Sequence, residues 1–173
     1  SQINPSFDWD DAAWLCKQWG GPVLLKGVVR PDDAVRAIKT GFSGVWVSNH
    51  GGRQLETAPA PIDVLPSIRG AVGPSVEIIL DGGVRRGTDI AKALALGADG
   101  VAVGKAYLYG LAAGGLPGVR KAIDILATEL ERALGLLGVA TVAELKAEGP
   151  SLVRRRALHT MLSRREGRDA HLW

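Results

Sequence analysis

The chain has 173 residues, of which 46% are hydrophobic and 23% charged, and its formal net charge is +3. With a mean hydropathy of +0.10, this composition indicates a packed globular core and excludes a disordered chain. The longest apolar runs are far too short to span a bilayer, and the single cysteine, Cys16, excludes an internal disulfide and favours a reducing, cytoplasmic compartment.

Short apolar runs alternate with helix-length segments along the chain. The strand-like runs are Pro22–Gly27, Gly44–Val47, Val76–Leu80 and Asp99–Val103. The helix-like segments are Trp9–Trp19, Pro31–Thr40, about Ile62–Val72, Thr88–Leu96 and Val119–Leu137, the last entered through a turn at Gly110–Gly118. Pro31 suits a first helical turn, and Gly41 and Gly97 suit helix ends. This alternation predicts an α/β fold with a parallel sheet and right-handed crossovers.

A histidine and an arginine follow the second strand-like run. His50 and Arg53 stand on either side of the glycine pair Gly51-Gly52, directly after Gly44–Val47. Parallel folds place their chemistry just past the carboxyl ends of strands. Histidine can accept a proton near neutrality, and an arginine fork pairs with a carboxylate. The pair indicates proton or hydride chemistry on a small acid; the alternative is a glycine turn without function.

The other strand ends also carry polar or glycine-rich groups. Lys26 closes the first run, where its charge needs an anionic partner. The third and fourth runs are followed by Asp81, Gly82, Gly83 and Arg85, and by Gly104 and Lys105. Glycines at helix starts expose backbone N–H groups to anions. We predict a phosphate site there; the alternative for the two adjacent glycines is a simple tight turn.

These motifs together resemble a known family. Ser-Asn-His-Gly-Gly-Arg-Gln-Leu at 48–55, with Leu-Lys-Gly before it and Asp-Gly-Gly-Val-Arg after it, resembles the FMN-dependent α-hydroxy acid dehydrogenases and oxidases. Glycolate oxidase, lactate oxidase, flavocytochrome lactate dehydrogenases and mandelate dehydrogenase are members. The resemblance runs from about Phe7 to near Leu145. It implies FMN as the cofactor and a TIM (β/α)8 barrel, of which these four βα units would form the C-terminal half.

The resemblance also implies a role for each strand-end residue. The reaction would be oxidation of an (S)-2-hydroxy acid, of the lactate or mandelate type, to the 2-oxo acid. His50, beside the flavin, would be the base, and Arg53 would hold the substrate carboxylate. Lys26 and Ser48 would contact the isoalloxazine ring. The ribityl phosphate would be held by Asp81, Gly82, Gly83, Arg85, Gly104 and Lys105. No metal is expected.

The chain departs from the family in two respects. The family generally has Gly-Arg where this chain has Gly104-Lys105, which keeps the charge but loses the bidentate fork. Members are also about twice as long, and this chain begins at Ser1 without an initiating methionine or a signal peptide. We therefore expect it to be part of a longer polypeptide. Its N-terminal half would supply the aspartate that orients the base and the rest of the pocket.

Residues 1–150 would form the half barrel, and residues 151–173 a basic tail with six arginines against Glu166 and Asp169. We expect this tail to be solvated or wrapped on a neighbouring subunit; the alternative is contact with an anionic surface at the inner face of a membrane. No aromatic residues interleave with its arginines, so nucleic-acid binding is not expected.

The expected partners are the small 2-hydroxy acid, the N-terminal half of the same barrel, and further copies in a homo-oligomer, a tetramer in the implied family. Two other functions stay open. One is a non-catalytic half barrel that binds flavin or phosphate, against which His50 and Arg53 argue. The other is a different FMN barrel enzyme, such as an isomerase.

Overall fold

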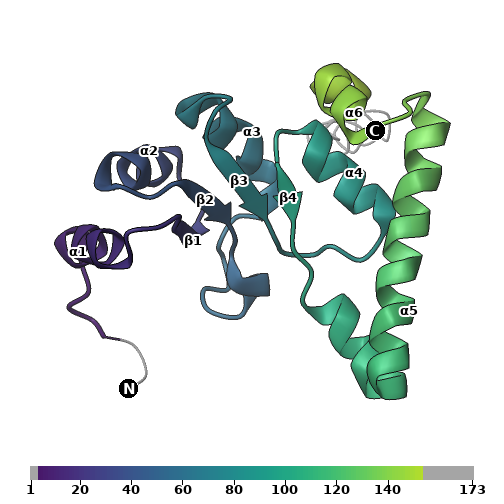
Figure 1. Cartoon of the computed structure of the whole chain (residues 1–173), viewed down its shortest axis with the longest axis horizontal. Helices are drawn as coiled ribbons and strands as arrows, with labels where there is room; N and C mark the ends of the chain where they lie inside the picture. Colours follow the sequence, from purple (N-terminus) through teal and green to yellow (C-terminus); the bar gives the residue numbers. More distant parts are fainter. Residues whose placement is uncertain (1–3, 154–173) are drawn as a thin grey trace, which may run out of the picture.

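Four parallel strands form the centre of the fold. A computed structural model describes residues 4–153, and its strands pair in chain order, β1-β2-β3-β4 (Figure 1). Their bounds are Leu24–Val28, Gly44–Val47, Glu77–Leu80 and Gly100–Val101. Every pair is parallel, with Val45 opposite Leu25 and Ile78. The alternation predicted from the sequence is therefore confirmed.

Six α-helices and two short 3-10 helices complete the described part of the chain. The helices are α1 (Trp9–Trp19), α2 (Pro31–Thr40), α3 (Pro61–Val72), α4 (Gly87–Ala95), α5 (Lys105–Leu137) and α6 (Val142–Glu148), with η1 (His50–Gly52) and η2 (Gly149–Leu152). Proline stands in the first turn of α2 and of α3. Gly41 ends α2 at a φ of 116°, a conformation that glycine adopts without strain, as the sequence predicted.

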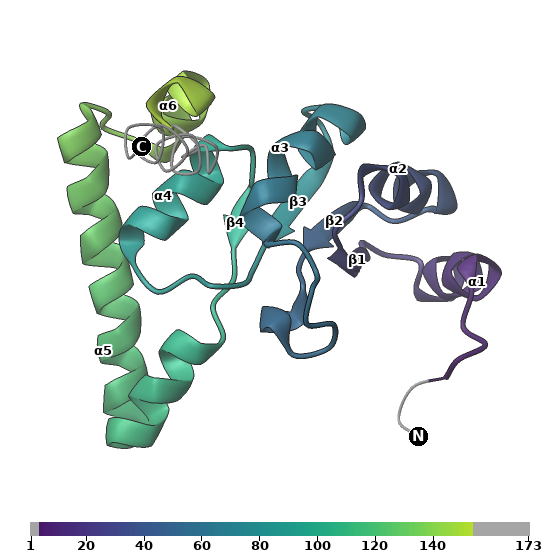
Figure 2. The ribbon, with the colours of Figure 1, turned by 180° about the vertical axis from the view of Figure 1, so that it is seen from behind.

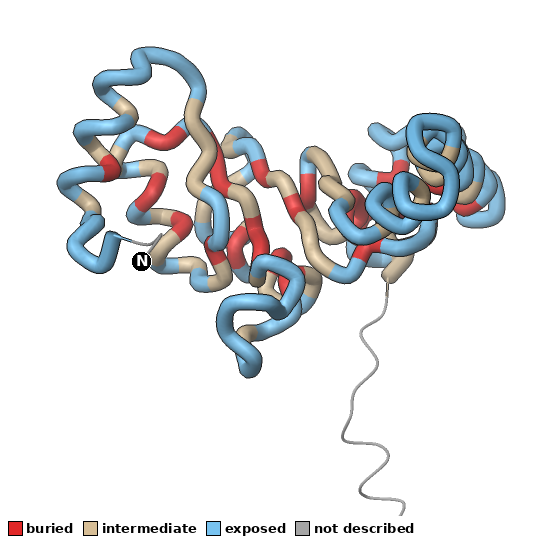
Figure 3. The backbone as a smooth tube through the Cα atoms, turned by 90° about the horizontal axis from the view of Figure 1, so that it is seen from below, coloured by how far each residue is buried: buried red, intermediate tan, exposed pale blue. Residues whose placement is uncertain are grey.

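Helices α2, α3 and α4 cover one face of the sheet (Figures 1 and 2). Val45, Val47, Ile78 and Leu80 point toward them and are 0–1% exposed. Because strand side chains alternate between faces, Lys26, Trp46 and Ile79 lie on the opposite face. Figure 3 shows the buried positions gathered between the strands and these helices. In a barrel, the helix-covered face is the outside and the other face lines the interior.

The segment after β4 contains the turn that the sequence predicted, with helix on both sides of it. The chain turns at Gly114 and Gly115, whose φ angles are −160° and 59°, inside the predicted run Gly110–Gly118. The first arm of α5 is already helical from Lys105, so the turn is shorter than that run. Gly110 and Gly118 let the two arms of α5 cross so closely that a Cβ on either would collide with the other's backbone. Glycine in this run therefore serves both the turn and the close packing of the two arms.

The sheet has free edges, as expected for four strands of a barrel. Within residues 4–153, β1 and β4 each have one neighbouring strand. Apolar side chains are exposed near β1: Trp14 is 63% and Trp19 69% exposed. Leu15, Trp19, Pro22 and Leu24 line a hollow of about 590 Å³ beside that edge. The apolar surface beside β1 is therefore left uncovered by residues 4–153.

The described chain ends in a packed segment. The predicted domain boundary after residue 150 lies inside η2, and Leu152 and Val153 pack against the cluster that includes Leu94 and Leu145. The basic tail predicted beyond it lies outside the described residues from 154 onward. Among helices within residues 4–153, none is long and apolar enough to cross a membrane.

Candidate active site

Lys26, Ser48 and Asp81 meet at the carboxyl ends of three adjacent strands. Lys26 Nζ donates to Ser48 Oγ at 3.0 Å and lies 2.5 Å from Asp81 Oδ2. Ser48 is 2% exposed, and its Oγ also accepts the backbone N–H of His50 at 3.0 Å. Asp81 is thus the anionic partner that the Lys26 charge needed. The cluster ties the start of the His50 loop to β1 and β3.

Asp81 has one oxygen without a donor. Its Oδ1 is buried and accepts no hydrogen bond from the described residues. An unsatisfied buried acceptor costs free energy unless a further donor reaches it. The sequence grouped Asp81 with the phosphate-binding residues, but a carboxylate repels a phosphate. A hydroxyl group of a bound molecule would satisfy this oxygen.

The loop after β2 holds His50 in an unusual backbone conformation. His50 has a φ of 56°, and among the described residues it is the one non-glycine residue with positive φ. Such residues are sparse and cluster at functional sites. His50 and Arg53 are both exposed and stand at the two ends of the η1 turn. The turn therefore presents both side chains on the same short loop.

Asn49 organises this loop, a role that was not predicted from the sequence. Its Oδ1 accepts the N–H of Gly52 at 3.2 Å, and its Nδ2 donates to the Pro59 carbonyl at 3.3 Å. These bonds hold both sides of the loop that contains His50. An asparagine before a glycine pair is a sequence signal for such a turn, so this role was open to prediction.

The loop after β3 packs against the loop after β2. Gly82 has a φ of 103°, and a Cβ there would lie 3.1 Å from Pro61 Cγ and 3.3 Å from Asn49 Oδ1. Gly83 has a φ of 75° and open space around it. Gly82 is thus required for close approach as well as for its backbone conformation. Gly83 leaves its backbone accessible.

The two helix starts at this edge differ in what they offer an anion. At α4, Asp89 Oδ2 accepts the N–H groups of Arg85 and Arg86, both at 3.1 Å, and Glu129 Oε2 accepts that of Gly87 at 2.9 Å. Carboxylates therefore occupy the N–H of Gly87, the first residue of α4, and those of the two residues before it. At α5, no side chain caps the start at Gly104. The α5 start is the one suited to an anion.

Lys105 connects the fourth strand end to the histidine loop. Its Nζ lies 3.8 Å from the position that a Cβ on Gly51 would take. Within residues 4–153, Arg53, Arg85 and Lys105 form no ion pair. Three exposed cations thus surround the strand ends without protein anions. In Figures 1 and 2, the loop after β2 and the first arm of α5 lie at the same end of the sheet.

Comparison with known proteins identifies the family of this chain. The model of the FMN-dependent dehydrogenase family matches residues 1–153. The chain belongs to this family. It is 52% identical over 142 residues to the pre-mycofactocin synthase of Mycobacterium tuberculosis, covering 82% of this chain and 36% of that protein. It is 49% identical over 144 residues to the L-lactate oxidase of Nostoc, covering 83% and 40%.

Solved structures agree with the family assignment. A soluble mutant of the membrane-associated (S)-mandelate dehydrogenase from Pseudomonas putida superposes with a TM-score of 0.84 at 39% identity, covering 90% of this chain and 43% of that one. The chain thus spans about two fifths of the length of its relatives: 36% of the pre-mycofactocin synthase and 40% of the L-lactate oxidase. The predicted fold is confirmed: this chain of the FMN-dependent dehydrogenase family forms part of a TIM barrel.

The residues present fit an FMN molecule. The unsatisfied Asp81 Oδ1 suits a ribityl hydroxyl, and the free α5 start with Lys105 suits a phosphate. Lys26, held by Ser48 and Asp81, presents a fixed ammonium at the same strand ends. A hydroxyl donor, a dianion and a ring that gains negative charge on reduction would thus each meet a complementary group. Within residues 4–153, no group of three or more acidic, histidine or cysteine side chains could hold a metal ion.

Proposed function

We propose that the protein containing this chain oxidises an (S)-2-hydroxy acid, of the lactate or mandelate type, to the corresponding 2-oxo acid with bound FMN. One observation carries the proposal. His50, at a φ of 56°, and Arg53 share an exposed loop that Ser48 ties to the Lys26–Asp81 pair. A base and a carboxylate-binding cation therefore stand next to the groups that fit FMN.

His50 is proposed as the base. It is exposed at the strand ends, and an imidazole near neutrality can take a proton from a substrate. Arg53 would bind the substrate carboxylate in two parallel hydrogen bonds. Because no protein anion pairs with it among residues 4–153, its guanidinium is available for that task. When bound, FMN supplies the acceptor for the two electrons that leave the substrate.

The remaining residues are proposed to hold the cofactor. Lys26 and Ser48 would face the isoalloxazine ring, and Asp81 Oδ1 would accept a ribityl hydroxyl. Arg85 and Lys105 would balance the phosphate charge. Gly82 and Gly83 would let the backbone approach the phosphate, and Gly104 would leave the start of α5 open to it. The N–H groups of Arg85, Arg86 and Gly87 would not take this role, because they already bond to Asp89 and Glu129.

The whole protein is proposed to be longer than this chain. The remaining strands of the barrel would cover the free edge of β1 and the exposed interior face, and would complete the substrate pocket. Assembly into a homo-oligomer, and contact of the basic tail with a membrane surface, stay predictions. The tail lies outside the described residues, although one solved relative is described as membrane-associated.

A different substrate is the second candidate, since 52% identity to a pre-mycofactocin synthase exceeds the 49% to the lactate oxidase. The two candidates share the cofactor and differ in what Arg53 contacts. A 2-hydroxy acid presents a carboxylate that Arg53 would bind, and competition by oxalate would then depend on that arginine. Loss of oxalate competition in the Arg53→Ala variant would therefore favour the 2-hydroxy acid.

The test is an anaerobic visible spectrum of the purified protein before and after addition of (S)-lactate or (S)-mandelate. A yellow protein that bleaches is the expected result. His50→Gln should keep the yellow colour and slow bleaching by about 10²- to 10⁴-fold, the usual range for loss of a general base. Admission of air then distinguishes an oxidase from a dehydrogenase that uses another acceptor.

The other outcomes are equally informative. A yellow protein that stays yellow with both acids, and binds no oxalate, would overturn the substrate class and favour the second candidate. Unchanged bleaching in His50→Gln would overturn the base. A protein that binds no FMN would overturn the cofactor assignment itself.

A further inference from the structure

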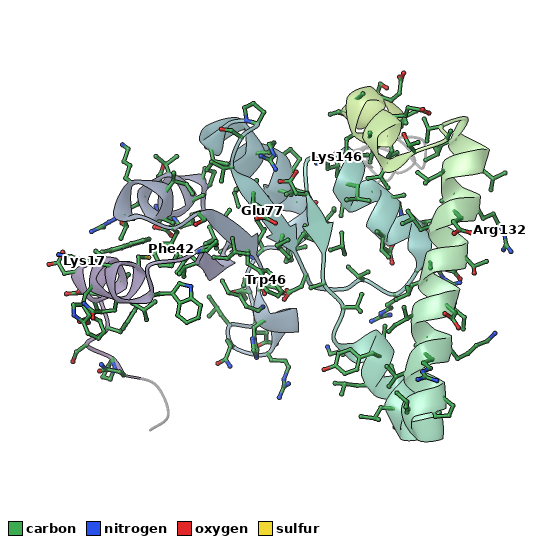
Figure 4. All side chains as sticks on the ribbon, viewed as in Figure 1. Lys17, Phe42, Trp46, Glu77, Arg132 and Lys146 are labelled. Atoms are coloured by element: carbon green, nitrogen blue, oxygen red, sulfur yellow. The ribbon has the colours of Figure 1, made fainter. Side chains whose placement is uncertain are left out.

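Trp46 lies on the interior face of the sheet directly beside Lys26. The two residues are register partners on β2 and β1. Trp46 alternates with the buried Val45 and Val47, which point to the helices, so its indole faces the other way. Figure 4 labels Trp46 at the strand end of the sheet nearest the histidine loop. Its neighbour on the other side is Ile79 of β3.

The Lys26 ammonium lies over the indole ring. The distance from Nζ to the ring centroid is 4.8 Å, well within the range of a cation–π interaction. Two donors of the ammonium go to Ser48 and Asp81. The side chain of Lys26 is nevertheless 44% exposed, and a lysine stem is flexible. The ring provides a third contact that restricts the ammonium to one place.

We propose that Trp46 is a positioning residue for Lys26. Its aromatic face holds the ammonium between Ser48 and Asp81, and so fixes the positive charge that Lys26 presents to bound FMN. The effect of Trp46 on the flavin rests on the proposed function, because the charge of Lys26 matters only where FMN gains electrons. The contact between ring and ammonium exists independently of the cofactor.

The simpler explanation is that Trp46 only fills the barrel interior. Its Nε1 is buried and donates to no described acceptor, so the indole N–H does not explain the choice of tryptophan. A filling role requires bulk, whereas a cation–π role requires an aromatic face. Trp46→Phe keeps a face and Trp46→Leu keeps apolar bulk without one. The two variants therefore separate the explanations.

The first experiment measures the two-electron midpoint potential of bound FMN in the purified protein. A cation–π contact of usual size corresponds to about a 2- to 30-fold equilibrium effect. Trp46→Leu should therefore make the potential more negative by about 30 mV, the equivalent of tenfold for two electrons. Trp46→Phe should stay near the wild type. In a Lys26→Met background, Trp46→Leu should cause no further shift.

Two results would overturn the proposal. One is an equal shift from Trp46→Leu with and without Lys26, which would mean that the tryptophan acts through packing. The other is an unchanged potential in Trp46→Leu while wild-type FMN binding and substrate bleaching are intact. In either case the proposed function would still stand.

The second experiment needs no cofactor. The face of an aromatic ring moves nearby proton resonances upfield, so the ε-methylene protons of Lys26 should be upfield-shifted in the NMR spectrum of isotope-labelled lysine. The Lys26→Met variant assigns the signal. The upfield shift should persist in Trp46→Phe and vanish in Trp46→Leu. If the wild type shows no upfield shift, the contact between Lys26 and Trp46 is overturned. This test holds whether or not the protein binds FMN.

Discussion

The two ends of the sheet use the same charged residue types in opposite ways. At the amino-terminal end, Arg69 of α3 uses four of the five N–H donors of a guanidinium. They go to the carbonyls of Gly97, Gly73 and Val76 at 2.7–2.8 Å and to Asp99 Oδ2 at 2.5 Å. Asp99 also accepts from Lys146 at 2.5 Å and from the Ile78 N–H at 2.9 Å.

At the carboxyl-terminal end, charges are left over. Arg53, Arg85 and Lys105 lack ion pairs within residues 4–153, and the buried Asp81 Oδ1 has no donor there. In Figure 4, Lys146 marks the satisfied end, opposite the loop that follows Trp46. In a TIM barrel, satisfied polar groups at the amino-terminal end serve stability and those at the carboxyl-terminal end serve chemistry. Unmet hydrogen-bonding capacity therefore distinguishes the candidate site from the scaffold.

Arg53→Ala gives the largest expected effect and tests the carboxyl-terminal end. Loss of a charge-assisted, bidentate contact to a substrate carboxylate should reduce kcat/KM by about 100-fold or more. The urea midpoint should stay the same, because Arg53 is exposed and unpaired within residues 4–153. Arg53→Lys, which keeps the charge without the fork, is the control and should recover part of the loss. If Arg53→Ala instead lowered the urea midpoint, the contrast between the two ends of the sheet would be contradicted.

Arg69→Met tests the amino-terminal end. It removes four hydrogen bonds and leaves carbonyls and a carboxylate without their donor, so the free energy of unfolding should fall by about 2–4 kcal/mol. KM should not change. Arg30→Ala is the matched control, since Arg30 pairs with Asp32 at 3.7 Å on the surface, and such exposed pairs contribute about 0–1 kcal/mol. Urea unfolding monitored by circular dichroism measures both variants.

Asp99 should make this end sensitive to acid. Burial raises the pKa of Asp99, but hydrogen bonds from Lys146, the Ile78 N–H and Arg69 outweigh it and hold the pKa below its ordinary value of 3.8. A lowered pKa stabilises the fold above 3.8, and this contribution disappears as the pH falls through the folded-state value. The stability gap between wild type and Asp99→Asn should thus be constant near neutrality and shrink below about pH 3.8. A stability gap that stayed constant at acidic pH would contradict the ionised pairing of Asp99 with Arg69 and Lys146.

The smallest expected effect concerns the lysine that stands in place of the usual arginine. Lys105→Arg adds a planar fork at the start of α5 and should tighten FMN binding severalfold, while Lys105→Met should weaken it by about 5- to 30-fold. Fluorescence titration of the apoprotein with FMN measures both. If neither variant changed the affinity for FMN, the phosphate would have to bind away from Lys105.

Much of the fold was readable from local signals. Pro31 and Gly41 mark the ends of α2, and the alternating runs mark four parallel strands, because these patterns depend on neighbours in the chain. The glycine run Gly110–Gly118 likewise marks the turn at Gly114 and Gly115. What the run did not reveal is that Gly110 and Gly118 let the two arms of α5 cross in contact, because that contact depends on packing and not on a local pattern.

The site divides in the same way. The sequence alone determined that His50, Arg53, Lys26 and Asp81 stand at strand ends, and the motif order determined the family resemblance, because strand ends and motifs are linear features. Only the tertiary structure decided that Asp81 pairs with Lys26, that Trp46 lies under the same ammonium, and that Glu129 accepts the first N–H of α4. Each of these depends on side chains from different elements meeting in space, and on which donors and acceptors remain unpaired when they have met.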